Sequence, residues 1–356
     1  MVPAYWTRDP EGKIRYIRVM SDLLVPERDL SVARRAERRE GYVRDARAPG
    51  TQAVYQRHWG YFVTWCQRHR VEPGVHVSAP LRSPVSPQTV ADYLVDLADE
   101  RKAHSTLQGA LAAIAARHHQ EGLPTPTAHP YVREILSGAR RRGAREGRGR
   151  GKSEPLLPPE LRRFVATLDD GLRGQRDLAL LTVGFAGGFR RSELVRIDVG
   201  DLRWGKDSVT IRLRWSKADQ EGEGHERRLV NGQHLELCPV RSLRAWLGSS
   251  GIQSGPVFRG VDRWGNVSRS ALSACRVDEI VREYVKLAMD AFPETFQGGH
   301  YSAHSLRSGL ITAALLAGKQ VQDVQAHVGH ASVQTTLGYA RAAAVRTSTV
   351  TSGIGI

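Results

Sequence analysis

Residues 304–339 read HSLRSGLITAALLAGKQVQDVQAHVGHASVQTTLGY, and three short apolar patterns in this stretch are separated by glycines and polar turns. The spacing of the apolar residues predicts three consecutive helices, over Ser305–Leu316, Val321–Val328 and Val333–Ala340. His304 precedes Arg307 by three residues, so both side chains would lie on one helix face and could together hold a phosphate. Tyr339, taken alone, would normally be a packing residue.

The same stretch contains His327-Val328-Gly329-His330, which is similar to half of a metal site. Structural zinc sites combine histidine with cysteine or carboxylate ligands, and no such cluster accompanies these two histidines in the sequence. We therefore expect no metal here.

A second polar motif is Gly188-Phe189-Arg190-Arg191-Ser192-Glu193-Leu194, which follows an apolar pattern that predicts a helix over Asp177–Phe185. Two arginines thus stand between a helix that ends in glycines and another that starts at Ser192. Unpaired N–H groups and the helix dipole make a buried helix end a natural site for an anion. The alternative interpretation is that both arginines are ordinary surface charge.

The residues around these motifs predict a mixed, mostly helical region from about Pro155 to Ala344. Val209, Ile211 and Leu213 alternate with polar residues, and a return strand at about Glu226–Val230 would complete a β-hairpin. Further helices are predicted over Glu160–Leu168, Val240–Leu247 and Ala271–Ala288.

The first half of the chain predicts a separate, all-helical domain. One helix would bury Tyr55, Trp59, Phe62 and Cys66, and a second would be capped by Ser86 and bury Val90, Leu94 and Leu97. A third would carry Leu107, Leu111, Ile114 and His118, and a short fourth helix would cover Tyr131–Leu136. Residues 1–48 are rich in Arg and Glu, and only the alternation at Ile14 and Tyr16 suggests a small hairpin there.

A basic segment follows the helical domain and predicts a flexible linker over residues 140–154. Its cationic residues are Arg140, Arg141, Arg142, Arg145, Arg148, Arg150 and Lys152. Four glycines lie among them, and the positive charges would repel one another unless they lay along phosphates. The segment is either a solvated linker or, as we favour, a linker that also grips a DNA backbone.

The composition agrees with a polyanionic partner and excludes several classes of protein. At 356 residues the chain is long enough for two domains, and 52 Lys and Arg against 37 Asp and Glu give a formal charge of +15. No apolar run approaches the length of about 18 residues that spans a membrane, and residues 1–9 lack a signal-peptide pattern. The three cysteines are too few and too scattered for a disulfide framework. We expect an intracellular protein.

Taken together, the motifs resemble the tyrosine recombinase, or phage integrase, family and within it the Cre-like enzymes. The resemblance rests on the order and spacing of seven residues: Arg190, Glu193, Lys217, His304, Arg307, His330 and Tyr339. It covers roughly residues 51–341. It implies an α+β fold, mainly α with a small β-hairpin or sheet, in which two domains form a C-shaped DNA clamp. The implied parts are an N-terminal extension (1–48), a SAM-like core-binding domain (49–139), the linker, a catalytic domain (155–346) and a polar tail (347–356).

The resemblance also implies a role for each residue. Arg190 and Arg307 would hold the non-bridging oxygens of one DNA phosphate, His304 and His330 would add hydrogen bonds, and Glu193 would orient Arg190. Tyr339 would attack the phosphorus to give a 3′-phosphotyrosine, so that no ATP, cofactor or metal is needed. Fixed cations stabilise the charge that develops on the phosphate, and nearby guanidiniums would favour the tyrosine phenolate. His304 would serve as the base, and Lys217 would protonate the leaving 5′ oxygen, which an arginine could not do.

The partners implied are double-stranded DNA and a second protein copy on each site, giving a tetramer on two sites, with a possible accessory directionality protein. Two assignments have rivals, because Arg191 adjoins Arg190 and Lys206 lies near Lys217. Ser308 stands after Arg307 where the family often has histidine, which leaves the proposed site intact. The alternative functions are DNA relaxation of the type IB topoisomerase kind and a catalytically silent DNA-binding protein. We expect a cytoplasmic, nucleoid-associated location.

Overall fold

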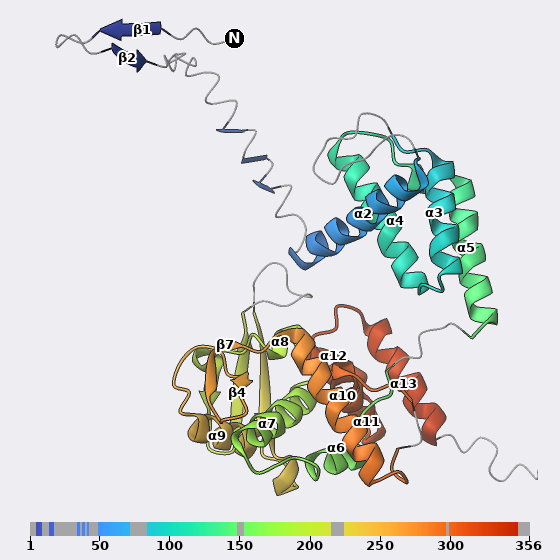
Figure 1. The fold of residues 1–356 in the computed structure, drawn as a ribbon. Helices are drawn as coiled ribbons and strands as arrows, with labels where there is room; N and C mark the ends of the chain where they lie inside the picture. Colours follow the sequence, from blue (N-terminus) through green and yellow to red (C-terminus); the bar gives the residue numbers. More distant parts are fainter. Residues whose placement is uncertain are drawn as a thin grey trace, which may run out of the picture. The chain divides into compact units, whose positions relative to one another are not determined.

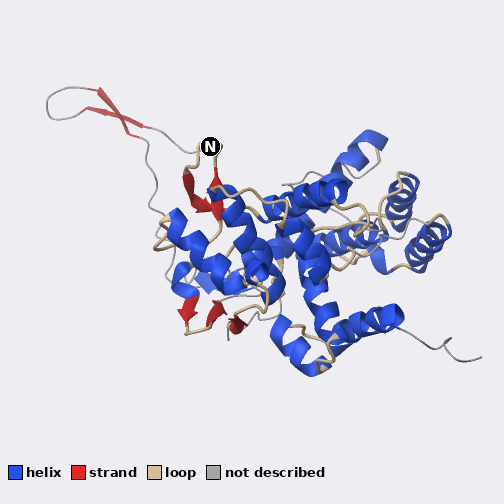
Figure 2. Cartoon of the chain, turned by 90° about the horizontal axis from the view of Figure 1, so that it is seen from below, coloured by secondary structure: helices blue, strands red, loops and turns tan. Residues whose placement is uncertain are grey.

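The computed structural model describes residues 5–8, 14–17, 34–35, 38–39, 41–42, 49–71, 84–147, 153–214, 224–296 and 299–347. The chain divides into two compact units, Met1–Arg148 and Gly149–Ile356, and each is described by itself (Figure 1). Helices account for most of the described residues, and the strands are few and short (Figure 2). The expected class, mainly α with small antiparallel sheets, is confirmed.

The first unit is built on four helices, α2 (Pro49–His69), α3 (Pro87–Asp99), α4 (His104–Gln120) and α5 (Pro130–Arg145), with a short 3-10 helix η1 (Pro126–Ala128) before the last. Phe62, Leu94, Leu107, Ile114 and Val132 meet in its apolar core. The predicted cap is confirmed, since Ser86 accepts a hydrogen bond from the Thr89 N–H at 3.0 Å. The short N-terminal hairpin is also present, with β1 (Tyr5–Arg8) paired antiparallel to β2 (Ile14–Ile17).

Helix α5 corrects the predicted end of the fourth helix and the predicted linker. The helix continues to Arg145, so four of the basic residues lie on an exposed helix instead of a flexible segment: Arg140, Arg141, Arg142 and Arg145. Arginine and alanine are good helix formers, and isolated glycines cost only about 1 kcal/mol each. Arg142 Nη1 also lies 3.5 Å from Asp99 Oδ1 on α3. The other three cationic residues, Arg148, Arg150 and Lys152, lie outside the described residues.

The second unit packs helices around a short antiparallel sheet. Its strands are β3 (Leu202–Trp204), β4 (Ser208–Leu213) and β5 (His225–Val230), in the order β3-β4-β5, and a separate hairpin pairs β6 (Arg259–Val261) with β7 (Val267–Ala271). Its helices are α6 (Pro158–Val165), α7 (Leu172–Gly187), α8 (Arg191–Leu194), α9 (Pro239–Ser250), α10 (Ala274–Ala291), α11 (Ala303–Leu316), α12 (Val321–Val328) and α13 (Val333–Thr347), with 3-10 turns η2 (Val199–Asp201) and η3 (Leu235–Leu237). The predicted β4–β5 hairpin is confirmed, with Leu213 opposite His225 at the end where the connecting segment begins.

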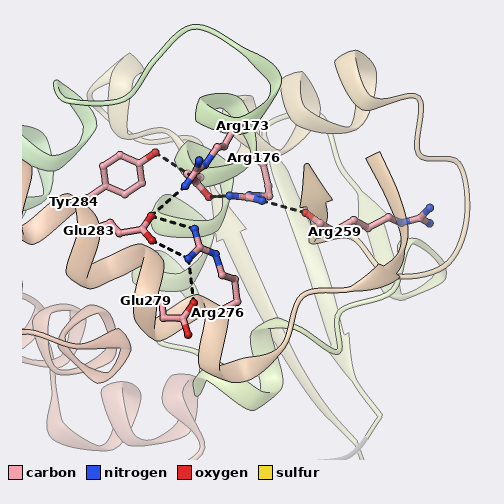
Figure 3. Close-up of polar contacts among 8 residues, drawn as sticks. Arg173, Arg176, Arg259, Arg276, Glu279, Glu283 and Tyr284 are labelled. Atoms are coloured by element: carbon pink, nitrogen blue, oxygen red, sulfur yellow. Dashed lines mark hydrogen bonds and ion pairs between the residues drawn. The ribbon is translucent and has the colours of Figure 1, made fainter. Parts of the chain in front are cut away.

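Helix α7 lies at the centre of this unit, and most of its side chains are buried. It also carries a buried ion pair (Figure 3), in which Arg176 Nε donates to Asp177 Oδ1 at 2.8 Å. The Tyr284 hydroxyl of α10 donates to the other carboxylate oxygen at 3.0 Å, and Arg176 Nη1 donates to the Arg259 carbonyl at 3.4 Å. The pair thus joins α7, α10 and β6. Around it, Arg173 and Arg276 contact Glu279 and Glu283 on α10.

Two elements differ from the sequence-based expectation. The β6–β7 hairpin was not predicted, because its strands are short and do not alternate apolar and polar residues. Helix α10 begins at Ala274 and not at Ala271, because Ala271 pairs with Arg259 in that hairpin and Ser273 caps the helix, its hydroxyl accepting from the Arg276 N–H at 3.0 Å. Within the described residues, none of the helices combines the length and the apolar character that crossing a membrane requires.

Candidate active site

The site is organised by the turn that ends α7. Gly188 adopts a left-handed conformation with φ of 55° and caps this helix. A Cβ atom there would lie 2.9 Å from both Leu310 Cδ2 and Val328 Cγ1, so the position is restricted to glycine by space as well as by conformation. The turn delivers Arg190 to the start of α8. Glu193 accepts the Arg190 backbone N–H at 3.0 Å and its guanidinium Nη1 at 2.5 Å, which fixes the arginine at both ends.

Arg307 approaches the same turn from α11. Its side chain is 1% exposed, and Nη1 donates to the Gly188 carbonyl at 2.6 Å. Its second terminal nitrogen, Nη2, is buried and has no hydrogen-bond partner among the residues that the structure describes. Burial and the nearby positive charges of Arg190 and Arg227 lower the pKa of Arg307 to about 9. A buried donor without an acceptor is costly, so the site is suited to an anion that supplies one.

Arg227, on β5, is a site residue that the sequence analysis missed. Nη1 donates to the Gly187 carbonyl at 2.8 Å, and Nη2 donates to the Val328 carbonyl at 3.0 Å and to Glu193 at 3.2 Å. This guanidinium thus ties together the end of α7, the end of α12 and the carboxylate that holds Arg190. Strand periodicity was the available signal, because Arg227 lies two residues before Leu229 and so on the buried face of β5.

The local charge is unbalanced. Three guanidiniums, Arg190, Arg227 and Arg307, share the single carboxylate of Glu193 among the described contacts. Burial by itself raises the pKa of Glu193, but the charges and hydrogen bonds of Arg227 and Arg190 outweigh burial and leave this pKa lowered. Glu193 is therefore ionised, and a net positive charge remains in a largely buried place. A phosphate diester has the charge and the oxygen acceptors that would balance it.

Tyr339 and the two histidines line the same place. The Tyr339 hydroxyl on α13 lies 2.9 Å from His304 Nε2, and the Tyr339 ring is stacked near His330, with centroids 6.1 Å apart and planes 14° apart. Burial followed by the charges of Arg307 and Arg190 lowers the pKa of His330 to about 4. The pKa of His304 is lowered as well. Partial burial of the ring is the larger cause, and the charges of Arg307 and Arg190 add to it. Both imidazoles are neutral near pH 7.

One expectation about Tyr339 needs correction. Nearby guanidiniums were expected to favour its phenolate, but the pKa of Tyr339 is raised in the DNA-free protein because burial outweighs the opposing charge of Arg307. The hydroxyl of Tyr339 is therefore protonated near pH 7. Removal of that proton needs a base, and His304 is placed to accept it.

The rival assignments separate in the structure. Arg191 points to a different neighbour, with Nη1 3.9 Å from Asp278 Oδ2, whereas Arg190 contacts Glu193. Lys217 lies outside the described residues, and Lys206 is exposed in the turn before β4. His327 donates from Nε2 to the Ala186 carbonyl at 2.9 Å. In the described part of the chain, no three His, Cys, Asp or Glu side chains lie close enough together to hold a metal ion.

Known proteins provide an independent comparison. Residues 155–346 match the model of the phage integrase family. The "Integrase/recombinase xerD homolog" of Selenomonas ruminantium is 35% identical over 273 residues, which cover 76% of this chain and 74% of that protein. A "Tyrosine recombinase XerC" of Chromobacterium violaceum is 26% identical over 70% of this chain and 83% of its own length. The solved XerH site-specific recombinase, bound to palindromic difH in a post-cleavage complex, shares the fold with a TM-score of 0.53 at 17% identity, over 76% of this chain and 72% of XerH.

Proposed function

The chain belongs to the phage integrase family of tyrosine recombinases, and from this premise we propose that Tyr339 is its nucleophile in site-specific DNA recombination. The observation that carries the proposal is the meeting of the Tyr339 hydroxyl and His304, 2.9 Å apart, beside three guanidiniums that share one carboxylate. The guanidiniums of this site would hold a DNA phosphate next to the Tyr339 hydroxyl, with no metal ion required.

The proposed step transfers one DNA strand to the protein. The Tyr339 oxygen attacks phosphorus, a new P–O(Tyr) bond forms, and the bond from phosphorus to the 5′ oxygen breaks. His304 takes the proton of Tyr339, and Lys217 gives a proton to the 5′ oxygen. The 3′-phosphotyrosine keeps the free energy of the broken ester, so a 5′ hydroxyl of the partner strand attacks it and reseals the DNA without ATP.

The arginines supply the main electrostatic stabilisation. Negative charge gathers on the non-bridging oxygens as the tyrosine attacks, and fixed cations there stabilise the transition state more than the ground state. Arg190 and Arg307 would contact these oxygens, and the free Nη2 of Arg307 supplies one donor. Glu193 and Arg227 keep the donors in place before DNA arrives, so little reorganisation is needed during the reaction.

The partners and domains extend the proposal. The helical part, residues 49–139, and the catalytic part, residues 155–346, would both bind double-stranded DNA. The exposed arginines of α5 would contact backbone phosphates. Two copies would occupy each site and four would pair two sites, with an accessory directionality protein as a further partner. The XerH complex contains DNA, which supports DNA as the partner. A protein that acts on cellular DNA would be found with the nucleoid, in the cytoplasm.

The experiment starts from a bound DNA site, selected from random duplexes with the full chain. A nicked version of that site is incubated with the wild type in EDTA, because the loss of a short leaving fragment traps the covalent intermediate. The sample is then run on a denaturing gel. A shifted protein–DNA band is expected for the wild type and for the control Tyr131→Phe, an exposed tyrosine on α5, and no band for Tyr339→Phe.

Other outcomes decide between the alternatives. Absence of the band for wild type on DNA that is bound would leave a silent DNA-binding protein. A band that survives Tyr339→Phe would identify another nucleophile. Relaxation of supercoiled plasmid without the selected site and without exchanged products would favour the topoisomerase-like activity.

A further inference from the structure

His330 is held by its neighbours at both the backbone and the ring. Gly329 ends α12 in a left-handed conformation with φ of 65°, and the His330 peptide is then bracketed by Gln325. The His330 N–H donates to the Gln325 carbonyl at 3.2 Å, and Gln325 Nε2 donates back to the His330 carbonyl at 3.0 Å. The ring Nδ1 lies 2.9 Å from Oγ1 of Thr336. The remaining ring nitrogen, Nε2, is therefore the atom left for a ligand.

Thr336 lies in the first turn of α13, three residues before Tyr339, and its side chain is fully buried. Within the part of the chain that the structure describes, His330 Nδ1 is the one hydrogen-bond partner of its hydroxyl. The direction of this hydrogen bond decides where the imidazole proton is, because a neutral histidine has one nitrogen that donates and one that accepts.

The two possible directions are not equivalent. If Nδ1 carried the proton and donated to Thr336, the hydroxyl hydrogen would be buried without an acceptor, which is unfavourable. If the hydroxyl donates to Nδ1, both groups are satisfied and the proton stands on Nε2. The charged imidazolium, which would leave that hydroxyl hydrogen without an acceptor as well, is disfavoured further by Arg307 and Arg190, whose charges help to lower the pKa of His330 to about 4.

We propose that Thr336 is a positioning residue that donates its hydroxyl to Nδ1 of His330 and so keeps the imidazole proton on Nε2, ready for a non-bridging oxygen of the DNA phosphate. The phosphate contact rests on the proposed function, whereas the position of the proton does not. With the other tautomer, Nε2 would present a lone pair to the phosphate, and the contact would become repulsive.

The first test reads the proton directly in the DNA-free chain. The protein is labelled with ¹⁵N in its histidines, and the ring signals of His330 are identified by their loss in His330→Asn. Long-range ¹H–¹⁵N spectra at pH 7.5 should show a protonated Nε2 in the wild type and in Thr336→Ser, which keeps the hydroxyl. Thr336→Val, nearly equal in shape, removes the donor and should move the Nδ1 signal downfield, as expected for a lone pair that has lost its hydrogen bond. A protonated Nδ1 in the wild type, or an Nδ1 signal that does not move in Thr336→Val, would overturn the proposal.

The second test separates positioning from packing. In single-turnover cleavage of the nicked site, Thr336→Val should slow covalent capture by about 10–100-fold, as is typical when a group that orients a histidine is removed. DNA affinity should stay within about twofold, Thr336→Ser should restore the rate, and in a His330→Ala background Thr336→Val should have no further effect. An equal loss in that background would mean that Thr336 only packs. If the wild type formed no covalent complex, the proposed function would fail and the spectra alone would decide the tautomer.

Discussion

Two buried charge clusters lie in the second unit and differ in their balance. In the first, Arg176 faces Asp177, and Tyr284 and a backbone carbonyl complete the contacts. In the second, Arg190, Arg227 and Arg307 have Glu193 as their one nearby carboxylate among the residues that the structure describes. Both clusters are built from arginine and carboxylate at the end or the start of α7, so residue types alone do not distinguish them.

The difference teaches how to separate a structural cluster from a functional one. A pair whose charges balance needs no further partner, and its removal should damage stability. A cluster with excess positive charge is incomplete without a ligand, and its removal should damage function more than stability. Three predictions test this distinction, and a fourth concerns the exposed arginines of α5; they follow in order of decreasing expected effect.

Asp177→Asn should cost about 3–5 kcal/mol of unfolding free energy, because it leaves the buried Arg176 cation without a counter-charge. Urea unfolding followed by circular dichroism measures the loss. Glu283→Gln, in the exposed contacts around this pair, is the matched control and should cost less than about 1 kcal/mol. The triple change Arg176→Met, Asp177→Leu, Tyr284→Phe should regain most of the stability. Equal losses for Asp177→Asn and Glu283→Gln would contradict the structural role.

Arg307→Gln should slow covalent capture of the nicked DNA by about 10²–10³-fold, the usual effect of removing one donor that stabilises a transition state. Its unfolding free energy should change far less than that of Asp177→Asn, because the substitution also removes an excess buried charge. Single-turnover gels and urea unfolding give the two values. Arg173→Gln, an exposed arginine paired with Glu283, should leave both nearly unchanged. A stability loss as large as that of Asp177→Asn would remove the contrast between the clusters.

Acid should destabilise the protein through the second cluster. His330 has a folded pKa of about 4 against 6.5 as its ordinary value, so between these pH values the unfolded chain binds more protons. Stability contributed by the neutral ring is therefore full above about pH 6.5 and is lost as the pH falls toward 4. Urea unfolding at pH 7.5 and pH 5 should show this loss of unfolding free energy. The loss should be smaller in His330→Asn, because that variant lacks the group that takes up the proton on unfolding. An identical pH slope in the variant would contradict the assigned shift.

The surface arginines of α5 should give the smallest single effects. Arg140→Ala, Arg141→Ala or Arg145→Ala should each reduce the slope of log affinity against log salt by about one, if each contacts one phosphate. Fluorescence anisotropy on the selected duplex at several salt concentrations measures this slope. The corresponding lysine substitutions keep the charge and should retain the slope. Unchanged slopes for all three alanine variants would place α5 away from the DNA.

The sequence predicted those helices and strands that bury one face and expose the other. Trp59, Phe62 and Cys66 recur at helical spacing, and all three are buried on α2. The β4–β5 hairpin was predicted because Val209, Ile211 and Leu213 alternate with polar residues and are buried in the structure. Helix α5 was cut short in the prediction because Gly138, Gly143 and the arginines also suit a linker. Periodic apolar residues define a face, whereas a charged helix end carries no such signal.

The candidate site was predicted by a different route. Arg190, His304, Arg307 and Tyr339 were singled out because their order resembles a known family, and local physics gave them only a general affinity for anions. The structure brings these four side chains together with Glu193 and His330. Arg227 and Thr336 were missed for different reasons. Arg227 contacts Val328, about 100 positions away in the sequence. Thr336 contacts His330, and the turn that brings the two together is not revealed by the sequence.

The β4–β5 ladder closes at the pair Leu213 and His225, and this closure has an evolutionary consequence. Eleven residues, 214–224, connect the two members of that pair, and they include Lys217. The cost of closing a loop grows slowly with its length, so insertions or exchanges in this segment need not disturb Arg227, two residues beyond the pair. Natural selection can therefore change the length of the segment around Lys217, provided that the lysine is kept, while the arginine framework on β5 is inherited intact.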